Sequence, residues 1–205
     1  DIEATVSCLK SLGAKCQEKN GTVTVFGKLE PENGAELYCG ESGSTLRFML
    51  PICLLFGKEI TLSGAERLFE RPLGIYEEIA KKEGFLFKKS KTGVTVCGKL
   101  KSGEYTLPGD VSSQFVSGLM FALSKVKGDS RIILSTELKS RPYVDMTIKA
   151  LAQFGVTVDE EPNGFLIKSG GFVPKNMSVE GDWSNAAFLD AFNLIGGEVE
   201  VLNLD

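Results

Sequence analysis

A spacing of about seventy residues recurs along this 205-residue chain and constrains its fold more than any other feature. Glycines typical of helix ends stand at Gly13, Gly84 and Gly155, each 71 residues from the next. Arg-Pro pairs, which are typical of helix starts, begin at Arg71 and Arg141, 70 residues apart. Recurrence at a fixed period indicates one supersecondary unit copied along the chain, so a repeat architecture is predicted.

Serine-rich helix starts follow the same period. They lie at Ser42, Ser112 and Ser184, at intervals of 70 and 72 residues. The predicted unit is strand, helix, strand, helix, strand, strand. By this interpretation the chain holds the last half of one unit, two whole units and the first half of another.

Hydrophobic periodicity and turn residues give the expected elements. Helices are predicted over residues 1–12, 46–56, 71–84, 109–125, 140–155 and 182–195. Strands are predicted over residues 15–18, 22–26, 36–39, 59–63, 85–89, 94–97, 104–107, 131–135, 156–159, 165–168 and 198–202. Hairpin turns are expected across Asn20-Gly21 and Asn163-Gly164.

Two of the predicted helices are unusually apolar. The segments 46–56 and 116–123 carry almost no charged face. A helix that is hydrophobic all round is buried. The predicted fold class is therefore α/β with buried parallel helices and outer sheets, the reverse of a doubly wound arrangement.

Composition excludes several classes of function. The chain has no histidine, which excludes a Ser-His-Asp triad, a Cys-His pair and most zinc sites, so no metal is expected. The five cysteines have no C-x-x-C spacing and indicate reduced thiols of a cytoplasmic protein. The net charge of −4, without a basic run, argues against a nucleic-acid partner.

No membrane segment is expected either. The longest apolar run, residues 48–56, contains Pro51 and is too short to cross a bilayer. The first residues have neither the basic start nor the apolar stretch of a signal peptide.

The stretch 40–49 is typical of an anion-binding turn. Its glycines let the backbone approach a ligand, and the helix that follows offers unpaired N–H groups. If parallel helices share one axis, their N-termini meet, and four arginines are expected near that rim. These are Arg47, Arg67, Arg71 and Arg141. The alternative is that the serines only cap helices and the arginines only pair with Glu66, Glu70 or Asp145.

Several polar residues have two interpretations. Asp110 and Asp182 precede helices and are predicted to be N-caps. Asp145, one turn after Arg141, is predicted to form an ion pair. Tyr143 either directs its hydroxyl to a ligand or packs, and Glu41 either disturbs the anion site or orients Arg47.

Five segments taken together carry a family resemblance. They are residues 40–47, 71–74, 108–115, 140–145 and 181–187. In order and spacing they resemble the 5-enolpyruvylshikimate-3-phosphate (EPSP) synthase family over essentially the whole chain. The resemblance implies an inside-out α/β fold of two domains. It implies transfer of the enolpyruvyl group of phosphoenolpyruvate to the 5-hydroxyl of shikimate 3-phosphate, with release of phosphate and without a cofactor.

Site residues follow from the resemblance position by position. Those implied for phosphoenolpyruvate are Gly43, Arg71 and Gln114. Those implied for shikimate 3-phosphate are Ser112, Ser113, Gln114, Ser140 and Tyr143. Arg47 is expected to be structural, near the pocket. The reaction needs a general acid and a general base, and neither is assigned to a residue here.

The chain also departs from the family pattern. Glu41 stands where many members have asparagine, and the family's N-terminal Lys-Ser motif and most of the second domain are absent. Residues 1–181 are expected to belong to the first domain, lacking its opening strand and helix, and residues 182–205 to begin the second. The chain is therefore expected to be a fragment that is inactive alone, with the missing domain as its partner.

Two alternatives remain open. One is the related enolpyruvyl transferase that acts on UDP-N-acetylglucosamine, which is expected to carry a cysteine-bearing loop and different helix starts. The other is a non-catalytic module that binds phosphate ligands at the same helix termini. The runs Ser112-Ser113-Gln114 and Ser140-Arg141-Pro142-Tyr143 favour the shikimate enzyme.

Overall fold

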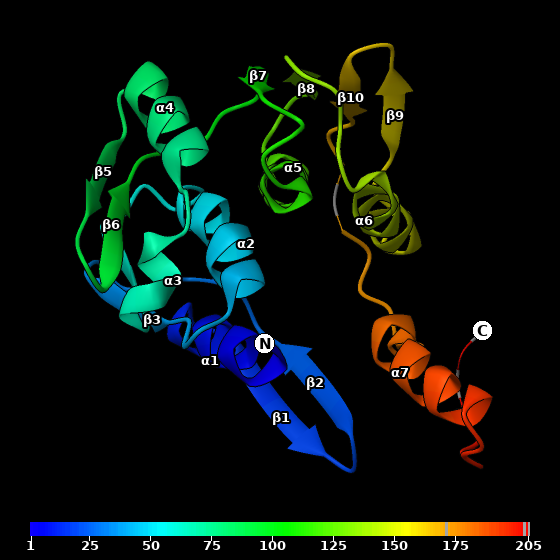
Figure 1. Cartoon of the computed structure of the whole chain (residues 1–205). Helices are drawn as coiled ribbons and strands as arrows, with labels where there is room; N and C mark the ends of the chain where they lie inside the picture. Colours follow the sequence, from blue (N-terminus) through cyan, green and yellow to red (C-terminus); the bar gives the residue numbers. More distant parts are fainter. Residues whose placement is uncertain (171, 203, 205) are drawn as a thin grey trace. The chain divides into compact units, whose positions relative to one another are not determined.

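The computed structural model describes residues 1–170, 172–202 and 204. The chain divides into two compact units, Asp1–Val173 and Pro174–Asp205. Figure 1 shows the elements of both units.

The first unit opens with a helix and a hairpin. Helix α1 (Ile2–Ser11) is followed by strands β1 (Lys15–Lys19) and β2 (Thr22–Phe26), which pair antiparallel. The turn between them has positive φ at Asn20 (50°) and Gly21 (73°), as expected for the Asn-Gly hairpin.

Two complete copies of the repeat follow (Figure 1). The first copy comprises β3 (Ala35–Tyr38), α2 (Gly43–Cys53), β4 (Ile60–Ser63), α3 (Glu66–Glu70), α4 (Gly74–Glu83), β5 (Leu86–Lys89) and β6 (Gly93–Cys97). The second copy comprises β7 (Glu104–Leu107), α5 (Ser113–Leu123), β8 (Ser130–Leu134), α6 (Arg141–Gln153), β9 (Val158–Glu161) and β10 (Gly164–Ile167). The sheets have matching orders, β3-β4-β6-β5 and β7-β8-β10-β9, each with one parallel pair at the start. The predicted repeat is confirmed.

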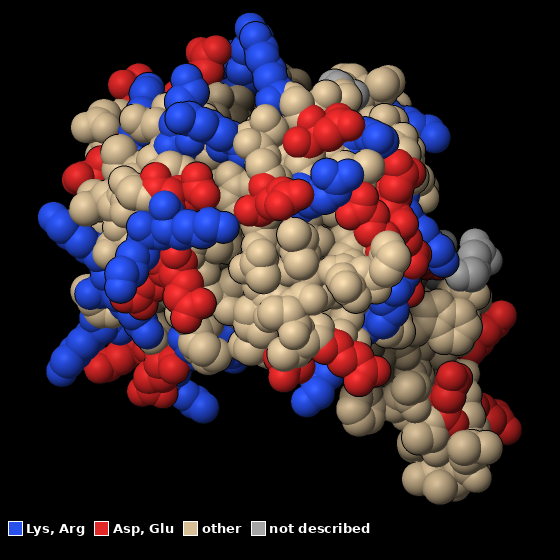
Figure 2. Space-filling model, turned by 90° about the horizontal axis from the view of Figure 1, so that it is seen from above, with Lys and Arg blue, Asp and Glu red and all other residues tan. Residues whose placement is uncertain are grey.

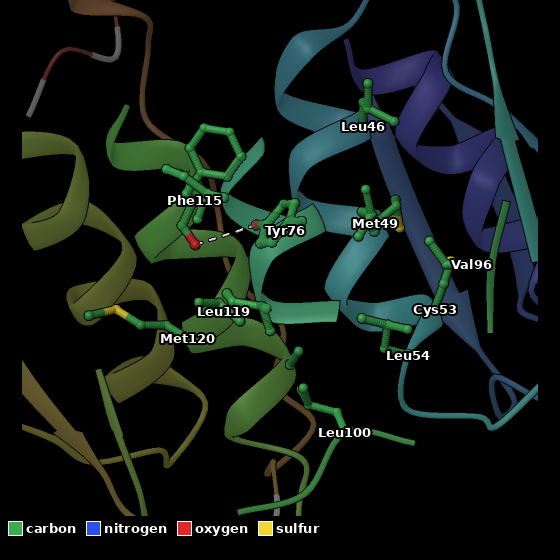
Figure 3. Close-up of a cluster of buried hydrophobic side chains, with 14 of the residues drawn as sticks. Leu46, Met49, Cys53, Leu54, Tyr76, Val96, Leu100, Phe115, Leu119 and Met120 are labelled. Carbon is green, nitrogen blue, oxygen red and sulfur yellow. Dashed lines mark hydrogen bonds between the residues drawn. The ribbon is translucent and has the colours of Figure 1, made fainter. Parts of the chain in front are cut away.

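Helices α2 and α5 form the centre of the first unit. They pack side by side, and nine of the eleven residues of α5 and eight of the eleven of α2 are buried. Figure 3 shows their side chains meeting in one cluster, which includes Leu46, Met49 and Leu119. The apolar segments predicted to be buried helices are therefore the core, and burial of their apolar surface stabilises the fold.

The opening hairpin differs from its repeat equivalents. Val94 and Val96 of β6 are 1% and 0% exposed because β6 pairs with strands on both sides. Val23 and Val25, which lie 71 residues earlier, are 41% and 52% exposed because β2 pairs only with β1 among the described residues. Side chains that are core in a four-stranded sheet are thus at the surface in a two-stranded one.

The helix expected to begin at the first Arg-Pro pair begins later. Arg71 is extended, at φ −67° and ψ 146°, and α4 begins at Gly74. A residue that precedes proline is disfavoured in the α region, which explains why Arg71 lies outside the helix. The short α3, which the sequence did not predict, ends at Glu70.

Two smaller expectations were wrong. Asp110 does not cap α5; it accepts a hydrogen bond from the Thr136 hydroxyl (2.7 Å), and Ser112 is the N-cap. The third hairpin turns at Pro162-Asn163, since Gly164 already pairs with Glu161.

The second unit contains helix α7 (Trp183–Leu194). Its N-cap is Asp182, as predicted, with the side chain accepting from the N–H groups of Ser184 and Asn185. Residues 198–202 do not form the expected strand, because no described strand pairs with them and a strand needs a hydrogen-bonded neighbour.

Two further predictions concerned reduced cysteines and membrane segments. All five cysteines are free thiols, with Cys8, Cys39 and Cys53 buried. Among the described residues, no helix is long and apolar enough to cross a bilayer.

Candidate functional site

A hollow of about 610 Å³ lies in the first unit where three helices begin. It is lined by Ser44, Arg47, Phe48, Arg71, Ser112, Ser113, Gln114, Ser117, Phe121, Ser140, Tyr143, Met146, Thr147 and Ala150. The first turns of α2, α5 and α6 all contribute, so their unpaired N–H groups and positive dipole ends meet there. This convergence was predicted from the recurring helix starts.

Two arginines border the hollow. A β-carbon at Gly43 would lie 2.5 Å from Nη1 of Arg71 and 3.7 Å from Nη1 of Arg47, so both guanidinium groups approach one point of the backbone. Within the described part of the chain neither arginine forms a salt bridge, and no carboxylate is among the described residues that line the hollow. The arrangement has unbalanced positive charge and suits an anion.

Arg47 is largely buried, at 9% exposed, and its guanidinium contacts two other side chains. Its Nη1 donates to Oε1 of Gln114 (2.6 Å), and its guanidinium lies 5.1 Å from the centre of the Phe115 ring. Its buried Nε has no hydrogen-bond partner among the residues that the structure describes. Burial, and then the charge of Arg71, lower the pKa of Arg47, which means that an anion in the hollow would relieve an electrostatic cost.

The serines around the hollow differ in their structural roles. Ser112 caps α5, with its hydroxyl oxygen accepting from the N–H of Gln114 (3.3 Å). Ser113 is buried in the first turn of the same helix. Ser140 has a left-handed backbone (φ 58°) and its side chain makes no capping hydrogen bond, so its hydroxyl is not occupied by the helix end. Capping therefore accounts for Ser112 but not for Ser140.

The structure shows where the side chains of Tyr143 and Glu41 lie. Tyr143 lines the hollow and is 59% exposed, which places its side chain at the mouth rather than in the core. Glu41 is exposed and forms no ion pair among the described contacts; Gln114 orients Arg47 in its place.

Some lining residues were missed by sequence reasoning. Ser117 and Thr147 hydrogen-bond to each other across α5 and α6 (2.7 Å), and Phe48 meets Phe121 edge to face at 5.4 Å. Ser117, Thr147 and Phe48 each lie four residues after a serine or tyrosine in a helix first turn. An i, i+4 extension of the predicted helix starts would have found them.

Two arginines expected at the rim lie elsewhere. Arg141 pairs with Asp145 (2.6 Å) and Glu160 (2.5 Å), which confirms the predicted ion pair but removes Arg141 from the hollow. Those carboxylates raise the pKa of Arg141. Arg67 is exposed on α3 and does not line the hollow. The prediction was wrong for both arginines because sequence spacing alone does not fix the direction of a side chain.

No group of three or more potential metal ligands occurs among the residues that the structure describes. Figure 2 shows acidic and basic side chains interspersed on the face that it draws, without a broad patch of one sign.

Buried parallel helices that begin at one rim, with outer sheets in matching repeats, define the inside-out α/β fold of the enolpyruvyl transferases. The fold matches that of an EPSP synthase from Acinetobacter baumannii, with a TM-score of 0.73 and 27% identity over 91% of this chain and 43% of that one.

The chain belongs to the EPSP synthase family, because the family model "EPSP synthase (3-phosphoshikimate 1-carboxyvinyltransferase)" matches residues 1–205. It is 42% identical to a 3-phosphoshikimate 1-carboxyvinyltransferase of Clostridium kluyveri and 40% identical to that of Clostridium novyi. All of this chain is covered in both matches, together with 49% and 50% of the relatives. The chain thus spans about half the length of these relatives.

Proposed function

We propose that the protein to which this chain belongs transfers the enolpyruvyl group of phosphoenolpyruvate to the 5-hydroxyl of shikimate 3-phosphate and releases phosphate. One observation carries the proposal. In a chain of the EPSP synthase family, Arg47 and Arg71 converge beside three helix N-termini, with no carboxylate among the described lining residues. Two small anions with phosphate and carboxylate groups fit such a rim.

The arginine side of the hollow suits phosphoenolpyruvate. Arg71 forms no ion pair among the described residues and offers a planar fork of donors to a carboxylate or phosphate. The bare backbone of Gly43 lets this guanidinium approach closely. Gln114, which holds Arg47, lies at the junction with the serine side and is proposed to contact both substrates.

The serine side suits the phosphate of shikimate 3-phosphate. Ser112, Ser113 and Ser140 stand at the starts of α5 and α6, where hydroxyl and backbone N–H donors are combined. Tyr143 borders the same space and is proposed to lie near the shikimate ring.

The chemical step adds the 5-hydroxyl oxygen to the enol carbon and then eliminates phosphate, which needs a general acid and a general base. None of the described lining residues is a carboxylic acid or a lysine. We therefore propose that these groups come from the other half of the protein. Residues 1–181 would form its first domain and residues 182–205 the start of the second, and we place the protein in the cytoplasm, where free thiols persist.

Phosphate release by the full-length protein, given both substrates, tests the proposal directly. Calorimetry separates the alternatives: heat with shikimate 3-phosphate supports the proposed reaction, heat with UDP-N-acetylglucosamine supports the related transferase, and heat with any small phosphate supports a binding module. The chain of residues 1–205 alone is expected to show no turnover, and substantial turnover would contradict the assignment of the acid and base to the other half.

A further inference from the structure

A proline interrupts the hydrogen bonding of the helix that carries Arg47. Pro51 lies inside α2 (Gly43–Cys53). In an α-helix the N–H of a residue bonds to the carbonyl four residues earlier, and proline has no N–H. The carbonyl of Arg47 therefore lacks the donor that residue 51 would normally supply. A buried carbonyl without a donor is costly, so another group must supply one.

Tyr76 supplies that donor from another helix. Its hydroxyl donates to the carbonyl oxygen of Arg47 (2.7 Å) and lies 3.4 Å from the carbonyl oxygen of Phe115. Figure 3 shows Tyr76 beside Phe115, and the two rings meet edge to face with centres 4.9 Å apart. Tyr76 is only 1% exposed, so water does not replace it.

The contact depends on close packing of the two central helices. A β-carbon at Gly118 would lie 2.5 Å from the carbonyl oxygen of Arg47 and 2.5 Å from the Tyr76 hydroxyl. Glycine at this position therefore leaves the space in which the hydroxyl of Tyr76 sits between α2 and α5.

The two backbones that Tyr76 contacts carry the site. Arg47 lines the hollow with its own side chain, and Phe115 directly follows Gln114, to which Arg47 is hydrogen-bonded. We propose that Tyr76 is a positioning residue for phosphoenolpyruvate. Its hydroxyl supplies the hydrogen bond that Pro51, without an N–H group, cannot donate to the Arg47 carbonyl, and so fixes the positions of Arg47 and Gln114 at the hollow. This proposal rests on the proposed function.

The state of the phenol agrees with this arrangement. Burial raises the pKa of Tyr76 far above its ordinary value, an effect that the nearby charge of Arg47 only partly opposes. The hydroxyl therefore keeps the proton that it donates.

The first test replaces Tyr76 in the full-length protein. Tyr76→Phe keeps the ring and removes the donor. The KM for phosphoenolpyruvate is expected to rise about tenfold, while the KM for shikimate 3-phosphate stays within about twofold. Tyr105→Phe is the matched control, since buried Tyr105 donates to the Lys101 carbonyl (2.7 Å) away from the hollow. It is expected to lower stability and leave both KM values unchanged.

The second test restores the missing amide. Pro51→Ala provides an N–H that can bond to the Arg47 carbonyl, so Tyr76→Phe should change the KM for phosphoenolpyruvate less than about threefold in that background. An equal effect of Tyr76→Phe in both backgrounds would overturn the proposal, as would equal changes in the two KM values. Absence of turnover in the unsubstituted protein would instead contradict the proposed function.

Discussion

Arg47 donates to Gln114 across 2.6 Å, although the two residues are 67 positions apart in the sequence. The bond joins the second turn of α2 to the first turn of α5, and these two helices occupy equivalent places in successive repeats. It links the arginine side of the hollow to the serine side. The site is thus made by the repeat itself, since equivalent helix starts are brought to one rim.

Replacing Arg71 should weaken phosphoenolpyruvate far more than shikimate 3-phosphate. Arg71 has no ion-pair partner among the described residues, so Arg71→Ala removes a ligand donor and little stability. Loss of charge-assisted hydrogen bonds corresponds to a rise of about 10- to 100-fold in the KM for phosphoenolpyruvate. Steady-state kinetics of the full-length protein measure it, with Arg67→Ala as the control. Equal weakening of both substrates would refute the role given to Arg71.

Adding a methyl group at Gly43 should displace the same arginine without unfolding the protein. The new β-carbon would lie 2.5 Å from Nη1 of Arg71, which is the far end of a flexible side chain and can move. Gly43→Ala is therefore expected to raise the KM for phosphoenolpyruvate by about tenfold. Gly74→Ala, where a β-carbon meets no neighbour within 4 Å, is the control. An unchanged KM in Gly43→Ala would mean that the guanidinium is not required in its present position.

Removing the Ser140 hydroxyl should act on the other substrate. Since this side chain does not cap α6, Ser140→Ala separates ligand binding from helix stability. Loss of one hydrogen bond to a phosphate should weaken shikimate 3-phosphate about tenfold. Calorimetric titration of the full-length protein measures it. Ser112→Ala should in addition cost about 1 kcal/mol of stability, because Ser112 is the N-cap of α5.

A methyl group at Gly118 should destabilise the first unit. Glycine to alanine inside a helix usually gains about 0.5–1 kcal/mol. Here the β-carbon would lie 2.5 Å from the backbone oxygen of Arg47, and overpacking of this kind costs about 1–3 kcal/mol. The clash is expected to win, so Gly118→Ala should lower the midpoint of thermal unfolding. A raised midpoint would show that α2 and α5 can move apart freely.

The carboxylate of Asp129 should make stability depend on pH. It accepts from the N–H of Ser169 (2.8 Å) and lies 3.4 Å from Nζ of Lys168. The backbone hydrogen bond and then the lysine lower the pKa of Asp129 below 3.8. A carboxyl group whose pKa is lower in the folded than in the unfolded state stabilises the folded protein at pH values above its unfolded-state pKa. This stabilisation is lost as the pH falls through the folded-state pKa. Thermal unfolding should therefore show Asp129→Asn less stable than the parent at pH 7, with the difference shrinking as the pH falls below 3.8. A difference that is independent of pH would contradict this.

The amino-acid sequence by itself determined the repeat, the strand and helix types and the burial of the two central helices. These follow from local patterns: period-two and period-3.6 hydrophobicity, Asn-Gly turns and the recurrence of glycines at 71-residue intervals. The gathering of Ser112, Ser140 and Arg71 at one rim was also predictable, because parallel helices in equivalent repeats must begin at the same end.

Only the tertiary structure decided which groups reach that rim. Arg47 and Arg141 both lie in first or second helical turns, yet Arg47 is buried against Phe115 and bonded to Gln114, whereas Arg141 turns to Asp145 and Glu160. Their directions depend on partners supplied by distant segments. The bond from Tyr76 to the Arg47 carbonyl is of the same kind, since it needs Pro51 to free an acceptor and Gly118 to leave room. Such contacts are absent from local sequence pattern because they exist only where separate helices pack together.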